Sequence, residues 1–326
     1  MTSSASHPRW LLRRFALAAF VVVGVATLTF ILIHAAPGDP IYVLAGDGGT
    51  PEYYADMRAK YGLDGPLLEQ FGRYARAVAV ADFGYSFMYQ APVVRVLVQH
   101  APASLLLGFT ALVLATCGGF IVGTFAGARP NGAFDQVTRA LGSVMYSAPV
   151  FWIGQVLIIL IAVKLRLLPA GGFTSARADL SGLRYAIDVG KHLVLPAVAQ
   201  SLPFMAVVAR VTRTAIADAL HEPFVLAARA RGIPARRVLM KHAAVSALVP
   251  VIALVGEHAA GVVAGAALTE ALFGWPGLGY LVLHASLHRD YPLVTATFIV
   301  ISSGVVFFNA ATDVACSYVD PRITLS

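Results

Sequence analysis

Charged residues are scarce in this sequence: Asp, Glu, Lys and Arg make up 13% of its 326 residues, against the roughly 25% that is usual in soluble domains. Apolar residues make up 58%, above the usual ~45–50%. There are only two cysteines, Cys117 and Cys316, and both lie in apolar segments. The sequence therefore supports neither a disulfide framework nor a metal cluster, and its composition predicts a polytopic membrane protein rather than a soluble domain.

Motifs for the common catalytic and phosphate-binding sites are also missing. The sequence contains no GxxxxGK[ST] phosphate loop, no HExxH zinc motif and no GxSxG nucleophile motif. Its histidines are scattered without metal-ligand spacing, among them His34, His192, His242, His258, His284 and His288. We therefore predict a chain that is not an enzyme, with no catalytic residues, no metal site and no nucleotide site of its own.

Long apolar segments are present instead. A helix needs about 20 apolar residues to cross the ~30 Å hydrocarbon core, and six segments qualify: 12–34, 101–128, 138–163, 192–213, 243–269 and 291–313. We therefore predict an all-α membrane protein with six transmembrane helices. The first segment follows three arginines as in a signal peptide, but its uncharged run 15–33 exceeds the usual ~7–15 residues. We expect a retained helix, with cleavage near Ala35-Ala36 as the alternative.

The positive charge of the chain indicates its orientation. The formal net charge is +7, and cytoplasmic-loop Lys and Arg explain this better than nucleic-acid binding does. Long loops translocate regardless of charge, so segment 35–100 is set aside, and the remaining Lys and Arg then place both termini in the cytoplasm. Segment 35–100 becomes an extracytoplasmic insert, with short amphipathic helices at 52–61 and 67–80. It is either a solvated cap or a docking surface for an external partner.

The most basic part of the sequence lies between the fourth and fifth segments. A helical pattern ends there at Gly232, and Pro234 can begin the next helix. Glycine just after the end of one helix and proline in the first turn of the next are the usual residues at these positions. Arginines cluster at this bend, namely Arg229, Arg231, Arg236 and Arg237. A short rigid bend can transmit force to membrane helices, but a basic loop can equally contact anionic lipid headgroups. These residues alone leave both interpretations open.

The bend also carries a family signature. The stretch Leu226-Ala227-Ala228-Arg229-Ala230-Arg231-Gly232 resembles the coupling loop of binding-protein-dependent ABC importer permeases, which reads Glu-Ala-Ala, three residues, then Gly. Leu226 replaces the Glu, as is usual in the oligopeptide, dipeptide and nickel branch of that family. Further matches to that branch follow in order: Pro37-Gly38-Asp39-Pro40, Leu63-Asp64-Gly65-Pro66-Leu67, Asp82-Phe83-Gly84-Tyr85-Ser86, Ser147-Ala148-Pro149, Arg236-Arg237-Val238-Leu239, Trp275-Pro276-Gly277-Leu278-Gly279, Arg289-Asp290-Tyr291-Pro292 and Asp320-Pro321-Arg322-Ile323.

This resemblance implies a permease subunit of the bacterial inner membrane with a type I importer core. The implied partners are a second homologous permease, two ATP-binding subunits that hold ATP and Mg²⁺, an extracytoplasmic substrate-binding protein and membrane lipid, without nucleic acid. The implied division is 1–34 for the N-terminus and first helix, 35–100 for the insert, 101–316 for a five-helix core with coupling loop 214–242, and 317–326 for a cytoplasmic tail. The implied coupling residues are Ala227, Ala228, Arg229, Arg231, Gly232, Pro234, Arg236 and Arg237. Peptides are the implied substrates, with nickel chelates or glutathione-like solutes as alternatives.

Glu257 and His258 lie deep in the fifth segment, where an ionisable side chain should face a cavity or another helix. Three interpretations stay open. The pair forms hydrogen bonds between helices, or it lines a translocation pathway where Glu257 meets the ammonium group of a peptide, or it relays protons in a secondary transporter.

Small residues further along the chain predict close contacts. Gly261 and Gly265 are four residues apart, which favours close packing against the partner permease over a gating hinge, and Gly261 is also a candidate pathway residue. Pro276, Gly277 and Gly279 predict a tight turn on the outer side. This turn is either part of a gate or a plain connection.

Overall fold

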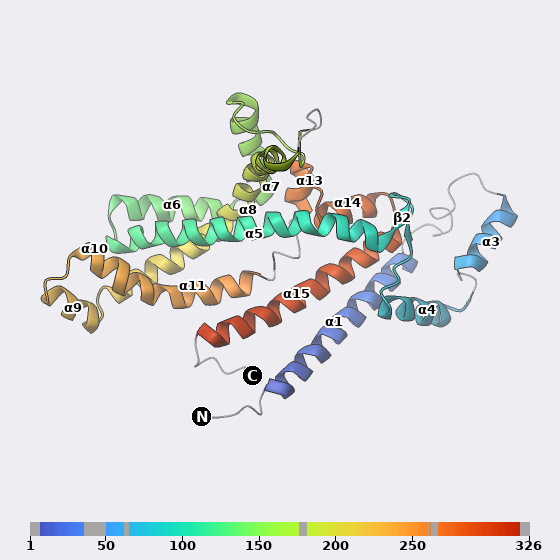
Figure 1. Ribbon diagram of the computed structural model, residues 1–326, viewed down its shortest axis with the longest axis horizontal. Helices are drawn as coiled ribbons and strands as arrows, with labels where there is room; N and C mark the ends of the chain where they lie inside the picture. Colours follow the sequence, from blue (N-terminus) through green and yellow to red (C-terminus); the bar gives the residue numbers. More distant parts are fainter. Residues whose placement is uncertain are drawn as a thin grey trace.

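The computed structural model describes residues 7–35, 50–61, 65–175, 181–259, 261 and 267–319. These residues are mainly helical, and the strands among them form one short antiparallel hairpin, β1 (Tyr85–Ser86) with β2 (Ala91–Pro92). The helices form an elongated bundle (Figure 1). At one end of it lie α9 (Pro223–Ala230) and α10 (Ala235–Val238), and at the other end α3 (Pro51–Tyr61) and α4 (Leu67–Ala79). The predicted all-α class is confirmed.

The two longest helices, α5 (Val93–Ala128) and α8 (Gly182–Ala219), form the centre of the bundle. Glycines spaced four apart on α5 allow the two backbones to touch. A Cβ atom at these glycines would lie 2.7, 2.5 and 2.6 Å from backbone carbonyl oxygens of α8, the pairs being Gly119 with Met205, Gly123 with Ala209 and Gly127 with Arg213. Because both members of these pairs advance together in sequence, α5 and α8 are parallel.

The third apolar segment is not one continuous helix, as predicted over 138–163. It consists of α6 (Ala133–Ser147) and α7 (Val150–Leu157), followed by a π-helical stretch at Ile158–Lys164. The two parts are bent by 108°. Pro149 causes the break, because it has no amide hydrogen and because a residue before proline avoids the helical region. Ala148 accordingly adopts an extended conformation with φ −77° and ψ 134°.

The fifth apolar segment also differs from its predicted range, 243–269. One helical span runs over 235–259, through α10, a π-helical turn at Leu239–Ala243 and α11 (Ala244–Ala259). The prediction began too late because it excluded the charged residues Arg236, Arg237 and Lys241, whose side chains lie on the exposed side of the helix. After the span come α13 (Ala267–Phe273), α14 (Leu278–Leu287) and α15 (Tyr291–Val319).

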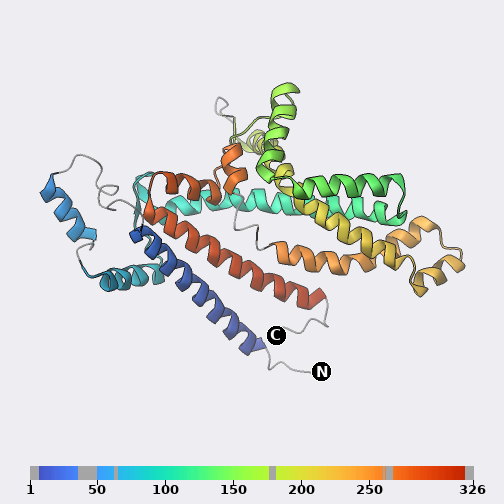
Figure 2. The same ribbon diagram turned by 180° about the vertical axis from the view of Figure 1, so that it is seen from behind.

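The number of membrane crossings is lower in the described residues than predicted. Four helices there are long and apolar enough to cross a membrane, and the bent pair of α6 with α7 would raise this to five. The N-terminal helix α1 (His7–Ala35) contributes only the shorter apolar stretch Ala19–Ile31. It lies beside α15 (Figure 2). Six crossings therefore stay a prediction.

The predicted insert contains the two expected short helices, α3 and α4. Its residues 93–100, however, belong to α5. The hairpin is held by Asp290, whose Oδ2 accepts hydrogen bonds from the Ser86 hydroxyl at 2.6 Å and the Met88 amide at 3.2 Å. Because Asp290 directly precedes α15, the insert is attached to the beginning of the last helix. The motifs at 37–40 and 320–323 lie outside the described residues.

Candidate functional site

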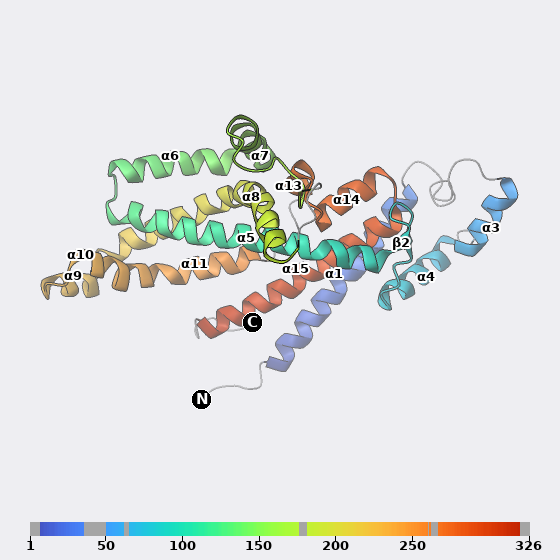
Figure 3. The ribbon, with the colours of Figure 1, turned by 45° about the horizontal axis from the view of Figure 1, so that its top comes forward.

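The elbow, residues 220–243, connects α8 to α11 and forms one end of the molecule (Figure 3). Its first helix ends in a Schellman motif, because the Gly232 amide donates to the Arg229 carbonyl at 2.9 Å and the Ile233 amide donates to the Ala228 carbonyl at 3.3 Å. Gly232 has a φ of +75°, which glycine adopts without strain. Pro234 is the N-cap of α10. The predicted helix break at Gly232 and the new start at Pro234 are confirmed.

The elbow is packed rather than loose. Its own small core consists of three buried residues and two partly buried ones, namely Val225, Ala228 and Val238 with Leu220 and Ile233. A neighbouring cluster joins the end of α8 to the beginning of α11 through Ile216, Ala219, Ala243, Ala244 and Ala247. Both stems and the bend between them are therefore fixed by apolar contacts.

The surface of the elbow combines positive charge with apolar side chains. Of the residues predicted to couple to an ATPase, only Ala228 is buried, while Ala227, Arg229, Arg231, Gly232, Pro234, Arg236 and Arg237 are exposed. Phe224, Leu226 and Met240 are exposed beside them. Within the described part of the chain, these arginines form no ion pair. Exposed apolar groups among unpaired arginines are typical of a protein-binding surface.

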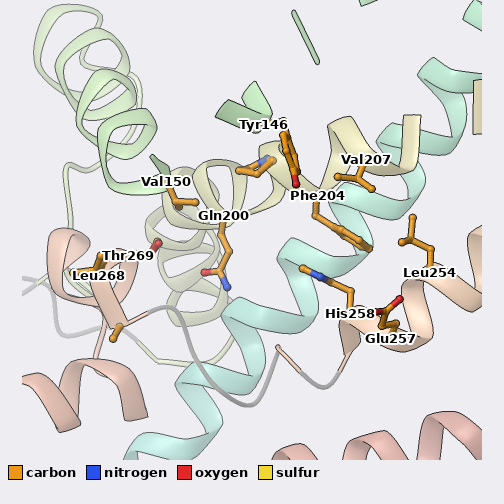
Figure 4. Close-up of a pocket in the computed structure, with 12 residues that line it drawn as sticks. Tyr146, Val150, Gln200, Phe204, Val207, Leu254, Glu257, His258, Leu268 and Thr269 are labelled. Atoms are coloured by element: carbon orange, nitrogen blue, oxygen red, sulfur yellow. The ribbon is translucent and has the colours of Figure 1, made fainter. Parts of the chain in front are cut away.

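A cavity of about 730 Å³ lies between the junction of α6 and α7, the middle of α8, the end of α11 and the start of α13 (Figure 4). Glu257 and His258, in the last turn of α11, both line it. The His258 ring stacks on Phe204 of α8, with 3.6 Å between ring centroids and 9° between ring planes. Glu257 forms no hydrogen bond or ion pair with any residue that the structure describes. An interhelical hydrogen bond of this pair is thus not seen among those residues.

Gly261 does not pack closely against the rest of the described chain. It is exposed, and a Cβ atom added there would meet no atom within 4 Å. Gly265, with which it forms the predicted packing pair, lies outside the described residues. The pathway role of Gly261 stays a prediction.

The tight turn predicted at Pro276, Gly277 and Gly279 is present and largely buried. Gly277 lies against the carboxylate of Glu270, and neither it nor Gly279 has space for a Cβ atom. Glu270 is itself fully buried and accepts a hydrogen bond from the Ser104 hydroxyl of α5 at 2.7 Å. The turn thus fixes α13 and α14 to α5. Its role in a gate stays a prediction.

Several important contacts were not predicted from the sequence. They are the glycine contacts of α5, the buried pair of Glu270 with Ser104, the ion pair of Asp135 with Arg213, and Gln200 in the cavity wall. The spacing of the glycines was visible, and an isolated charge next to an apolar segment does indicate a buried partner. Which residue serves as that partner depends on packing between distant segments.

Two family models match this chain. The model described as "Binding-protein-dependent transport system inner membrane component" matches residues 119–325, and the N-terminal model of the same membrane components matches residues 8–108. This chain belongs to that family. Members of the family are the permease components of importers rather than their ATPases, so the predicted family is confirmed.

Relatives match over almost the full length. The chain is 34% identical to the dipeptide transport system permease protein DppB of Escherichia coli (strain K12), over 97% of this chain and 98% of that protein. It is 34% identical to the probable peptide ABC transporter permease protein y4tP of Sinorhizobium fredii, over 96% and 98%. It is 32% identical to the oligopeptide transport system permease protein OppB of Haemophilus influenzae, over 91% and 93%. Together with the apolar helices, the family identifies a multi-pass inner-membrane protein.

Proposed function

We propose that this chain is a transmembrane permease subunit of an ATP-driven importer of peptides. The observation that carries the proposal is the match along nearly the whole chain to a dipeptide permease, 34% identical over 97% of this chain. A second homologous permease forms the other half of the translocation pathway. The partners supply ATP hydrolysis, and this chain contributes the path and the mechanical connection.

The elbow is the proposed contact with the ATP-binding subunits. Its exposed arginines and its exposed Phe224, Leu226 and Met240 offer a partner both charge and apolar surface. The Schellman motif at Gly232 and the packed stems make it stiff enough to pass a displacement on to α8 and α11. ATP and Mg²⁺ are bound by two partner subunits, and this chain needs no cofactor.

The proposed orientation places the elbow and both termini in the cytoplasm and the insert 35–100 outside. In support, the N-terminal end of α1 and the C-terminal end of α15 point toward the elbow, and α3 and α4 lie at the opposite end of the molecule (Figure 3). An extracytoplasmic binding protein delivers the peptide on the side of the insert. The core 101–316 then carries the pathway, and 317–326 forms the cytoplasmic tail.

Purification and reconstitution test this proposal. The chain is co-expressed with its second permease, its ATP-binding subunits and its binding protein, extracted in mild detergent and placed in liposomes. We expect the ATP-binding subunits to remain attached and the liposomes to take up labelled di- and tripeptides only with ATP and the binding protein. Uptake driven by a proton gradient without the ATPase would contradict the proposal. A preference for nickel chelates or glutathione would show that peptides are not the substrate.

A further inference from the structure

The cavity contains hydrogen-bond acceptors that lack donors. The side-chain oxygen Oε1 of Gln200 is buried, and it has no hydrogen-bond partner in the described part of the chain. The carboxylate of Glu257 has no partner there either. These two side chains come from different helices, α8 and α11, and line the same cavity. Glu257 is exposed, so its negative charge is open to a cation that enters the cavity, whereas the buried Gln200 oxygen lacks a hydrogen-bond donor.

Most of the remaining wall of the cavity is apolar or aromatic, and its other polar groups are the hydroxyls of Tyr146 and Thr269 and the ring of His258. Gln200, Phe204 and Val207 lie one turn apart on the same face of α8. The stacking of Phe204 on His258 holds the Glu257 turn against this face. The lining residues in the described part of the chain include no Lys or Arg, and the basic side chain beside Glu257 is that of His258.

Other charged groups fit this cavity less well than an ammonium group does. A carboxylate end of a ligand would meet the negative charge of Glu257 with no Lys or Arg among the described lining residues to offset it. A metal ion would need more ligands, and the described residues contain no group of three or more His, Cys, Asp or Glu that could hold one. An ammonium group provides N–H donors and one positive charge, which matches the Glu257 carboxylate, while Gln200 lies on the other side of His258 in the same cavity (Figure 4).

We propose that the cavity binds the ammonium group of the transported peptide, with Glu257 neutralising its charge and Gln200 Oε1, elsewhere in the wall, accepting a hydrogen bond from the same peptide. The peptide as ligand rests on the proposed function, whereas the preference for a cation rests on the cavity alone. Because the other walls are mostly apolar, the site selects for the charged end and tolerates different side chains. The permease thus adds its own recognition of the substrate to that of the binding protein.

Cysteine labelling of the assembled complex tests the charge preference without any peptide. The native Cys117 and Cys316 are replaced by Ser, and Gln200→Cys is introduced. The cationic trimethylammonium-ethyl methanethiosulfonate should react at least about fivefold faster than the anionic sulfonatoethyl analogue, each rate being divided by its rate with a free thiol. Adding Glu257→Gln should bring this ratio close to one, and Glu257→Asp should preserve it. A ratio that does not depend on Glu257, or no labelling by either reagent, would overturn the cation site.

Peptide uptake by the reconstituted complex tests the substrate itself. The binding protein and its load of trialanine are the same for all variants, so differences belong to the permease. Glu257→Gln should lower the initial rate of uptake at least about tenfold, and the matched Glu257→Asp should stay within about threefold of the wild type. Retention of the ATP-binding subunits is measured for each variant.

The results separate this inference from the proposed function. If the wild-type complex takes up no peptide but the labelling ratio depends on Glu257, the proposed function fails and the cation site stands. If the wild type takes up trialanine and Glu257→Gln does so equally well, the inference fails alone. Equal loss of uptake in the Asp and Gln variants, or loss of the ATP-binding subunits from the Gln variant, would assign Glu257 to packing and overturn the inference.

Discussion

The guanidinium group of Arg213 binds the buried carboxylate of Asp135 through two hydrogen bonds, 3.0 Å from Nε to Oδ1 and 2.8 Å from Nη2 to Oδ2. The backbone N–H of Asn131 donates to Oδ2 of the same carboxylate at 2.8 Å. Asp135 lies in the first turn of α6, and Arg213 lies in the part of α8 that leads into the elbow. A bidentate pair fixes both position and orientation, so the connection between α5 and α6 is attached to the stem of the elbow.

We expect Arg213→Met to destabilise the protein by about 3–5 kcal/mol, because it leaves a buried carboxylate without its counter-ion. The matched control is Arg139→Met. Arg139 lies 3.7 Å from the same carboxylate, but its side chain is 54% exposed, so its loss should cost less than about 1 kcal/mol. Unfolding of the detergent-purified variants measures both values. Equal effects of the two substitutions would contradict the assigned role of Arg213.

Gly232→Val should disconnect the ATP-binding subunits. There is space for a side chain, since a Cβ atom would meet nothing within 4 Å, but the φ of +75° is strained for a branched residue. We expect the strain to displace α10 and to reduce ATP-driven uptake at least about tenfold. The control is Gly232→Asn, because asparagine tolerates this conformation. Uptake by the Val variant at the level of the Asn variant would show that the left-handed turn is dispensable.

Reversing charge on the elbow should abolish docking without unfolding the protein. Arg236→Glu with Arg237→Glu changes two exposed side chains outside the elbow core. We expect at least about a tenfold loss of bound ATPase in a detergent pull-down, because the substitutions reverse the charge of the surface that is proposed to contact the ATP-binding subunits. Arg129→Glu reverses an exposed charge between α5 and α6 and serves as the control. If the double variant bound the ATPase as well as the wild type does, these elbow arginines would not be part of the interface with the ATP-binding subunits.

Gly123→Ala should weaken the contact between α5 and α8. Its Cβ atom would lie 2.5 Å from the Ala209 carbonyl oxygen, so the helices have to separate at a cost of about 1–3 kcal/mol. Gly190→Ala is the control, since a Cβ atom there meets nothing within 4 Å. In a helix the Ala should be neutral or stabilising by up to about 1 kcal/mol. Thermal unfolding of both variants in detergent compares them, and equal stability would exclude a close contact at Gly123.

Local signals in the sequence predicted the elbow well. The Gly232 break and the Pro234 start depend on backbone preferences of single residues, which act in any context. The same kind of signal was available at Pro149, but the apolar run around it favoured one continuous helix. Hydropathy also placed the start of the fifth span too late, because it does not register that charged side chains can lie on one face of a helix.

Contacts between distant segments could not be predicted in the same way. Ser104 and Glu270 are far apart in the sequence, and only the fold brings the hydroxyl to the carboxylate. The sequence does not single out Gln200, and its place in the cavity wall depends on how α11 and α13 lie relative to α8. The acidic character of Glu257 was visible, whereas the acceptor across from it was not.

Helix α8, which lies parallel to α5, connects the elbow to the wall of the cavity. With 1.5 Å of rise per residue, Gln200 lies roughly 30 Å along α8 from the end of that helix at the elbow. The close contacts at Gly119, Gly123 and Gly127 hold the elbow half of α8 against α5. If the two helices move together, a displacement at the elbow end of α8 reaches the cavity wall through these contacts.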